Sequence, residues 1–91
     1  MHKFSIEENL KKKLNRLFKK DKSLYDSFIK KFEKILTCKD VNHYKNLKSP
    51  LQNFKRVHIK CSFVLIFKYI ESEDKVVFYE LDRHDNIYTK K

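Results

Sequence analysis

The sequence predicts an α+β fold in which an N-terminal helical hairpin packs on a small, twisted antiparallel sheet. Apolar residues recur at helical spacing through the first 36 residues, and from Phe54 onward the period changes to two. The segment Ser62–Ile70 is almost continuously apolar, as expected of a central strand. Helices that precede the strands favour a helical layer on one face of an antiparallel sheet. A chain of 91 residues is expected to form a single domain over residues 1–91.

Two amphipathic helices account for the first third of the chain. The first helix is predicted to begin at a capping box formed by Ser5 and Glu8, and its apolar face contains Leu10, Leu14, Leu17 and Phe18. Ser23 and Asp26 repeat the capping signature and predict a second helix that ends near Leu36. The apolar positions of this second helix are Tyr25, Phe28, Ile29, Phe32, Ile35 and Leu36. The short connection between the helices predicts an antiparallel hairpin.

The strands follow a polar loop. Lys3–Ile6 is a candidate short first strand, and Thr37–Asn53 reads as a loop that contains Pro50. From Phe54 the alternation places Arg56, His58 and Lys60 on the polar face of a strand. A central strand (Ser62–Ile70), a charged turn (Glu71–Asp74) and a further strand (Lys75–Leu81) complete the expected sheet.

The charge is strongly positive and unevenly distributed. Lysine and arginine together number 22 and acidic residues 12, which gives a formal net charge of +10. Residues 1–70 hold 18 basic and 6 acidic side chains, a net +12, whereas residues 71–91 hold 4 basic and 6 acidic ones, a net −2. This balance favours a polyanionic partner such as RNA, or an acidic protein. Only three of the basic residues are arginine, so base-specific DNA reading gains little support.

Several function classes are excluded or disfavoured. The chain contains no glycine, which rules out a glycine-rich phosphate loop and a dinucleotide-binding fingerprint. The longest apolar run, Phe63–Phe67, is far shorter than a bilayer span, so no membrane association is expected. The two cysteines are far apart and form no CxxC motif, as is typical of a reduced, cytoplasmic protein.

The histidines near the strands suggest phosphodiester chemistry. His58 lies between Arg56 and Lys60, His84 follows Arg83, and His43 lies in the long loop. One histidine can take the proton of a ribose 2′-hydroxyl while another group protonates the leaving 5′-oxygen. Cationic side chains then stabilise the charge that develops on phosphorus. Tyr88 is a candidate for base stacking or hydrogen bonding.

Less specific interpretations remain open for the same residues. A histidine on a strand surface is commonly only solvated, and lysine-rich helix faces commonly serve solubility. Cys38, His43, His58 and Cys61 could in principle bind zinc, but their spacing matches no standard zinc motif. We therefore expect no metal site and no cofactor.

The second half of the chain resembles the RelE/ParE toxin superfamily, especially its RelE and YafQ-like mRNA interferase branch. The resemblance rests on H-Y-K-N-L-K-S-P-L-Q-N-F-K-R-V-H-I-K-C-S-F-V-L-I-F-K, from His43 to Lys68, and on V-V-F-Y-E-L-D-R-H-D-N-I-Y, from Val76 to Tyr88. The lysine-rich helical hairpin is also similar to that family, so the resemblance covers nearly the whole chain. It implies a type II toxin that enters the ribosomal A site, cleaves mRNA there through 2′-hydroxyl attack, and pairs with an antitoxin protein.

The resemblance also implies site residues. Histidines of YafQ-like active sites fall on His58 and His84, and the cationic and tyrosine positions of RelE-like members suggest Lys55, Arg56, Arg83 and Tyr88. Two YafQ-like positions differ, because this chain has Ser62 and Ser49 where an acidic residue and a histidine are expected. The proton relay therefore cannot be transferred intact, and His43 or Lys48 is the candidate to compensate.

The predicted site accordingly has two parts. The catalytic candidates are His58, His84, Arg56 and Arg83, and the RNA-binding candidates are Lys48, Lys55, Lys60, Tyr88 and His43. Two other functions stay open: a ParE-like toxin that inhibits DNA gyrase by binding, and a non-catalytic basic RNA- or protein-binding domain. The two histidines near the sheet and the terminal H-x-x-I-Y favour the ribonuclease.

Overall fold

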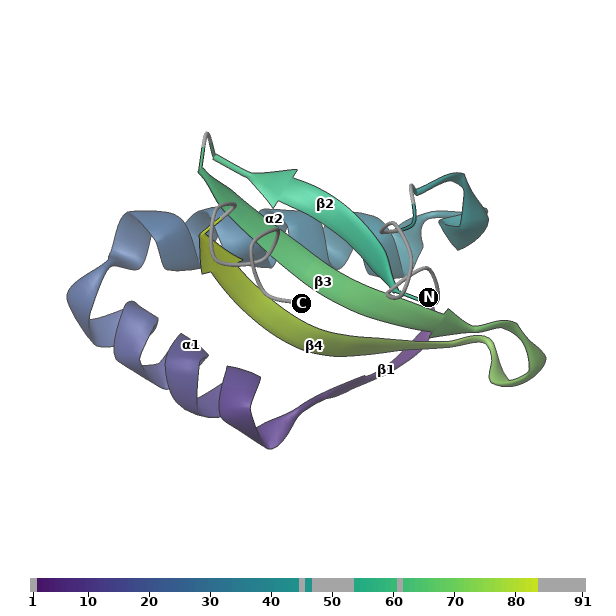
Figure 1. Ribbon diagram of the computed structural model, residues 1–91, viewed down its shortest axis with the longest axis horizontal. Coiled ribbons are helices and arrows are strands. Elements are labelled where there is room, and N and C mark those ends of the chain that lie inside the picture. The colour runs from purple at the N-terminus through teal and green to yellow at the C-terminus, as the bar shows by residue number, and fades with distance from the viewer. Residues whose placement is uncertain (1, 45, 47–53, 61, 84–91) are drawn as a thin grey trace.

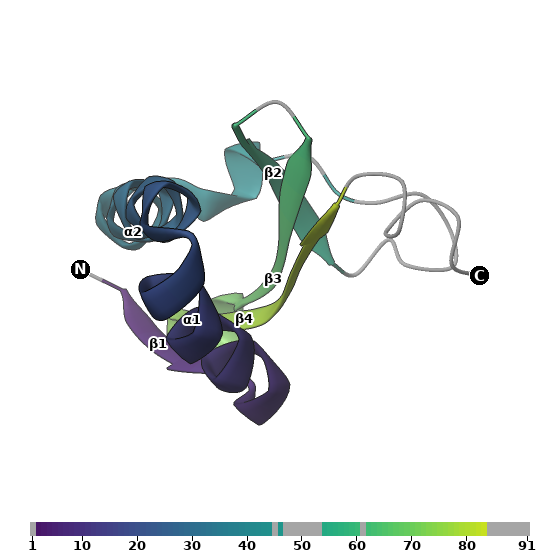
Figure 2. The same cartoon turned by 90° about the vertical axis from the view of Figure 1, so that its left-hand side faces the viewer.

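Both α-helices in the described part of the chain cover the same face of a four-stranded sheet (Figure 1). The computed structural model describes residues 2–44, 46, 54–60 and 62–83. The elements in chain order are β1 (Lys3–Ile6), α1 (Glu8–Lys20), α2 (Lys22–Thr37), the 3-10 helix η1 (Val41–His43), β2 (Lys55–Ile59), β3 (Phe63–Ile70), the 3-10 helix η2 (Glu71–Glu73) and β4 (Lys75–Arg83). Figure 2 shows α1 and α2 together on one side of β3 and β4. The predicted α+β class is confirmed.

The sheet is mixed rather than wholly antiparallel. Its strand order is β1-β4-β3-β2, and the pairs β2–β3 and β3–β4 are antiparallel as predicted. β1 instead runs parallel to β4, with Lys3 opposite Lys75 and Ile6 opposite Phe78. Both helices, β2 and β3 lie between β1 and β4 in the sequence, and a connection of this length permits a parallel pair. β1 and β2 therefore form the two edges of the sheet.

Neither α-helix begins at the capping box that the sequence predicts for it. Ser5 lies within β1 opposite Val77, so it belongs to the sheet and not to a helix cap. α1 begins after Glu7, which makes no side-chain cap. Asp21 separates the helices: its N–H donates to the carbonyl of Leu17 (2.8 Å), and its carboxylate accepts from the N–H of Leu24 (3.1 Å). A single residue thus ends α1 and begins α2, and the Ser23 signature is wrong by two positions.

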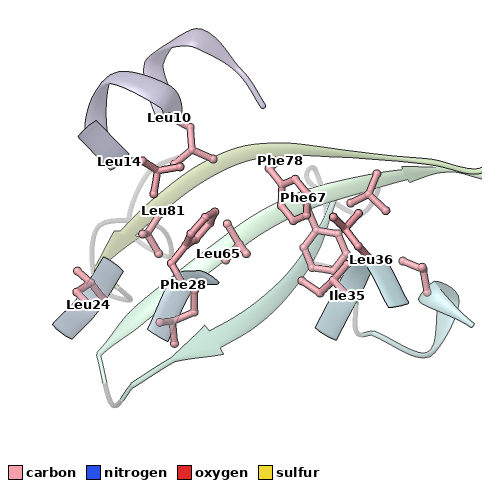
Figure 3. Close-up of a cluster of buried hydrophobic side chains, with 13 residues drawn as sticks. Leu10, Leu14, Leu24, Phe28, Ile35, Leu36, Leu65, Phe67, Phe78 and Leu81 are labelled. Atoms are coloured by element: carbon pink, nitrogen blue, oxygen red, sulfur yellow. The ribbon is translucent and has the colours of Figure 1, made fainter. Parts of the chain in front are cut away.

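The main core lies between the helices and the inner, helix-facing side of the sheet (Figure 3). Phe28 from α2 is almost fully buried, and the rings of Phe32 and Phe78 lie 4.8 Å apart. Phe18 is 52% exposed, so it is not part of the predicted buried face of α1. No helix in the described ranges is long and apolar enough to cross a membrane.

A bulge in β4 changes which face its side chains occupy. Phe67 pairs with Phe78 but Ile66 pairs with Glu80, so Tyr79 is an extra residue on the β4 side. Before the bulge Val76 and Phe78 enter the main core, and after it Leu81 does. Arg83, two residues further, therefore lies on the inner face of the sheet.

The outer face of the sheet carries a smaller apolar cluster. Val64 and Ile66 are buried there against Phe54 and Tyr79, whose rings meet edge to face at 4.8 Å. Because β2 pairs with β3 in register, Arg56 lies opposite Ile66 and shares this outer face. The outer face is thus apolar in its centre and cationic toward β2.

An N-terminal clamp, formed by His2, Tyr69 and Asp74, fastens the start of the chain to the turn between β3 and β4. Asp74 adopts a left-handed backbone (φ 50°) after η2, and its carboxylate accepts from Tyr69 Oη (2.8 Å) and contacts His2 Nδ1 (2.5 Å). His2 Nε2 also contacts the carbonyl oxygen of Cys38. The hydrogen bond from Tyr69, followed by that from His2, lowers the pKa of Asp74. The same bond to Asp74 is the main cause that raises the pKa of Tyr69.

Candidate active site

The edge strand β2 presents Arg56 and His58 on the outer face of the sheet. Arg56 lies opposite Ile66 and His58 opposite Val64, while Ile59 enters the main core on the other face. The alternation arises because successive side chains of a strand point to opposite faces. Val64 in turn lies opposite Asp82, so His58 and Asp82 occupy the same row across β2, β3 and β4.

A pocket of about 320 Å³ lies beside β2 and gathers residues from two parts of the chain. Its lining consists of His43, Tyr44, Arg56, Val57 and His58, and we refer to it as the β2-edge pocket. His43 and Tyr44 come from η1 and the residue after it, whereas the other three belong to β2. Two imidazoles and one guanidinium therefore line one cavity, although His43 and His58 are remote in sequence.

Local hydrogen bonds orient the His43 ring. The Asp40 carboxylate accepts from the N–H of Asn42 (3.1 Å) and caps η1, and His43 Nδ1 lies 2.6 Å from the Asp40 carbonyl oxygen. A carbonyl oxygen can only accept, so Nδ1 carries the proton in this contact. In the neutral ring Nε2 is then left as an acceptor, which is the arrangement that a general base requires.

Tyr44 forms the wall of the pocket next to His43. The two rings lie 4.1 Å apart, and the Tyr44 ring also meets Phe67 edge to face at 5.6 Å. Burial, followed by the negative charge of a Cys38 thiolate, raises the pKa of Tyr44. The phenol therefore stays protonated near neutral pH and remains a hydrogen-bond donor.

Lys55 supports the pocket from beneath. Its side chain is on the inner face and only 8% exposed, and its ammonium donates to the carbonyl of Tyr44 (3.3 Å) and to Asn46 Oδ1 (2.9 Å). Asn46 also forms a bridge with Lys55 through the backbone. Lys55 therefore holds the segment after η1 against β2, a placement that differs from the expected RNA contact.

Lys60 is also not where the alternation placed it. Its backbone is left-handed (φ 56°), which interrupts the period-two pattern immediately after β2. Its ammonium contacts Ser23 Oγ near the start of α2. Lys60 therefore turns toward the helices and away from the face that carries Arg56 and His58.

Arg83 lies on the opposite face from the β2-edge pocket. It pairs with Phe63, and its guanidinium lies over the Phe63 ring at 5.8 Å. It lines a separate cavity of about 280 Å³, the Arg83 cavity, whose other cationic members are Lys13 and Arg16 from α1. The structure thus does not place Arg83 with Arg56 and His58 as the sequence predicted, because the bulge at Tyr79 shifts the end of β4 by one position.

Four residues of the sequence-based site interpretation lie outside the described residues: Lys48, Cys61, His84 and Tyr88. Of the alternative zinc site, Cys38 Sγ and His43 Nδ1 lie 3.5 Å apart, and the thiol also contacts the Asp40 carbonyl. Among the described residues, no three side chains of His, Cys, Asp or Glu are grouped as a metal ion requires.

The sequence did not identify Tyr44 as a pocket residue. It lies in the segment Thr37–Asn53, for which the sequence predicts a loop, whereas the structure forms η1 there. Its position next to His43 was the only available signal. The cationic pair of Lys13 and Arg16 in the Arg83 cavity was also missed, because both belong to the polar face of a helix.

Comparisons with known proteins place the whole chain among toxins. No family model matches it. It is 46% identical over 91 residues to a protein of Methanocaldococcus jannaschii named "Putative toxin RelE4", covering all of this chain and 95% of that protein. An uncharacterized protein of Methanosarcina mazei is 38% identical over 88 residues, covering 97% of this chain and all of that protein.

Solved structures share the fold. The isolated Escherichia coli RelE toxin superposes with a TM-score of 0.72 at 14% identity, over 98% of this chain and 93% of that chain. A chain of the intact E. coli RelBE toxin–antitoxin complex gives the same TM-score at 13% identity, over 91% of this chain and 96% of that chain. A metal-bound toxin of Helicobacter pylori gives a TM-score of 0.75 at 22% identity, over 96% of this chain and 99% of that chain. At these identities the likeness concerns the fold.

Proposed function

The chain belongs to the RelE toxin family, and on this basis we propose that it is an endoribonuclease that cleaves mRNA in the ribosomal A site. The observation that carries the proposal is the β2-edge pocket, where His43, Arg56 and His58 line one cavity. Two imidazoles and a guanidinium are the groups that cleavage by 2′-hydroxyl attack requires.

The reaction assigns one role to each side chain. His43 Nε2 takes the proton of the ribose 2′-hydroxyl, since Nδ1 is held by the Asp40 carbonyl. The 2′-oxygen attacks phosphorus, the bond from phosphorus to the 5′-oxygen breaks, and His58 donates a proton to that leaving oxygen. Arg56 stabilises the additional negative charge on the phosphoryl oxygens. The products are a 2′,3′-cyclic phosphate and a free 5′-hydroxyl, and no cofactor takes part.

The remaining sequence-based candidates keep their proposed roles through the family resemblance. His84 and Tyr88 are proposed to contact the substrate, with His84 as a further proton-transfer group and Tyr88 as a base-stacking group. Arg83 is proposed to bind RNA from the Arg83 cavity, together with Lys13 and Arg16, rather than to act at phosphorus.

The proposed partners follow from charge and from a structural neighbour. A net charge of +10 is suited to the RNA-rich surface of a ribosome. One structural neighbour belongs to a toxin–antitoxin complex, and we extend this pairing to the present chain. An acidic antitoxin that covers the cationic surface would neutralise it electrostatically.

Replacing His58 tests this function. We expect His58→Gln to abolish growth arrest on induction and to lower the cleavage rate on programmed ribosomes by about 10²–10⁴-fold, the contribution typical of acid–base groups. Primer extension on a translated message locates the cuts, and His2→Gln is the matched histidine control outside the pocket. Growth arrest with intact messages, accompanied by loss of gyrase supercoiling activity, would instead support a ParE-like inhibitor.

A further inference from the structure

A second cationic cavity lies between α2 and the end of β2. It has a volume of about 280 Å³ and is lined by Ser27, Lys30, Lys31, Lys34, Ile59 and Lys60. The four α2 residues fall at positions i, i+3, i+4 and i+7, which places them on one face of the helix. We refer to this cavity as the lysine groove. Figure 1 shows α2 running behind β2 and β3. The shared lining with Ile59 and Lys60 places this face of α2 beside the end of the edge strand.

The position of Lys60 completes the groove. Its left-handed backbone turns the chain after β2, and its ammonium contacts Ser23 Oγ one turn before Ser27 on α2. A left-handed conformation is unfavourable for a lysine, so the local structure must hold it. The consequence is that Lys60 joins the three lysines of α2 in lining the groove.

The chemistry of the lining fits a phosphate backbone better than a protein. None of the six lining residues carries a carboxylate or an aromatic ring, and Ile59 is the only large apolar side chain among them. Protein interfaces are enriched in aromatic residues and arginine and depleted in lysine. Lysine ammonium groups instead act as point charges that neutralise phosphates without reading the bases.

The lysine groove adjoins the β2-edge pocket along one strand. Arg56, Val57 and His58 line the pocket, and the next two residues, Ile59 and Lys60, line the groove. The pocket cations Arg56 and His58 are on the outer face of β2, whereas Ile59 and Lys60 face the helices. Because β2 is an edge strand, a polyanion can pass around this edge from one cavity to the other.

We propose that the lysine groove binds the sugar–phosphate backbone of the same RNA strand that the β2-edge pocket cleaves, at nucleotides that flank the scissile bond. This inference rests on the proposed function for the identity of the strand. The groove adds affinity and register to the substrate, while the chemistry stays with the pocket.

Binding of the full chain to 2′-O-methyl RNA tests the proposal without requiring cleavage. The test variant combines Lys30→Ala, Lys34→Ala and Lys60→Asn, because asparagine tolerates the left-handed backbone. The matched control combines Lys12→Ala, Lys19→Ala and Lys20→Ala, which removes the same charge from exposed positions of α1. Circular dichroism and thermal melting check that both variants fold.

For a 12-nucleotide strand, we expect the test variant to lose affinity on the order of tenfold, and its logarithmic salt slope to flatten by about 2, since each neutralised phosphate contributes about 0.7. The control should keep the wild-type slope.

Three results would overturn the proposal. The first is an unchanged salt slope for the 12-nucleotide strand. The second is a loss confined to ribosome binding, which would assign the groove to ribosomal RNA. The third is an affinity for poly-glutamate that equals the affinity for RNA and falls to the same extent in the test variant, which would assign the lysine groove to an acidic protein. A different result separates this proposal from the proposed function. If the chain binds RNA through the lysine groove but does not cleave messages, the proposed function is refuted, while RNA binding by the groove is supported.

Discussion

Two histidines that contact the same residue, Cys38, have opposite surroundings. His2 has a side chain only 12% exposed, and both of its ring nitrogens face oxygen atoms, of Asp74 and Cys38. His43 is exposed, lines a cavity, and has only Nδ1 committed to a carbonyl oxygen. The same residue type thus fastens the start of the chain at position 2 and is available for proton transfer at position 43. Burial and hydrogen-bond partners, rather than residue type, separate the structural histidine from the catalytic candidates.

The largest effect is expected from His43→Gln. Because its Nε2 is the proposed base, the substitution should lower the single-turnover cleavage rate by about 10²–10⁴-fold, with thermal stability close to that of the wild type. Cleavage of ribosome-bound message measures the rate, and a melting curve measures stability. A variant that cuts at the wild-type rate would remove His43 from the chemistry.

A smaller loss of activity is expected from Lys55→Met. The change keeps the buried apolar stem but removes the ammonium that donates to Tyr44 and Asn46, so the wall that carries His43 is held less firmly. We expect cleavage to slow by roughly tenfold, as a displaced catalytic group would produce. An RNA-binding role for Lys55 would instead raise KM and leave kcat unchanged, which steady-state kinetics distinguishes.

His2→Gln should give the reverse of the His43 result. The substitution removes a ring that bridges two parts of the chain, and we expect a fall in Tm of roughly 4–8 °C with cleavage retained below that temperature. Differential scanning calorimetry together with the cleavage assay makes the comparison. Loss of cleavage in a variant that remains folded would contradict the division between a structural His2 and a catalytic His43.

The smallest effect concerns the pH dependence of the clamp. The folded pKa of Asp74 is below its ordinary value of 3.8, so its carboxylate stabilises the fold above that pH, and this contribution is lost as pH falls through the folded pKa. In Asp74→Asn the free energy of unfolding should therefore fall less steeply at acid pH than in the wild type, as measured by urea unfolding between pH 6 and pH 3. The folded pKa of Tyr69 is raised, so its contribution to stability is lost as pH rises above about 10. In Tyr69→Phe the free energy of unfolding should therefore fall less steeply at alkaline pH. If both variants keep the pH dependence of the wild type, the clamp contributes nothing to stability.

The fold was largely predictable from periodicity. The helical stripe and the change to period two located both α-helices and the three strands after Phe54, because burial on one face imposes these spacings. Lys3–Ile6 was only a candidate strand, and the structure forms β1 there. The parallel pairing of β1 was not predictable, since it depends on which edge of the sheet the first strand joins. The capping boxes failed because Ser5 is committed to the sheet ladder and Asp21 serves both helices.

The candidate site was predictable only where strand alternation holds. Arg56 and His58 share a face, as the pattern in β2 indicated. Lys60 and Arg83 departed from it for local backbone reasons: a left-handed residue after β2 and an extra residue within β4. No sequence spacing predicts either of these two backbone features. His43 reached the pocket through η1, a tertiary arrangement that the composition of the loop did not reveal.

The most direct test of the β2-edge pocket is a photo-crosslink from the scissile nucleotide. A ribosome-bound message that carries a photoreactive base and a 2′-deoxy sugar at the cut position cannot be cleaved, and mass spectrometry identifies the attached residue. We predict attachment to the segment His43–Tyr44 or to Arg56–His58. Attachment to Lys13, Arg16 or Arg83 would place the reaction on the other face of the sheet and contradict the account.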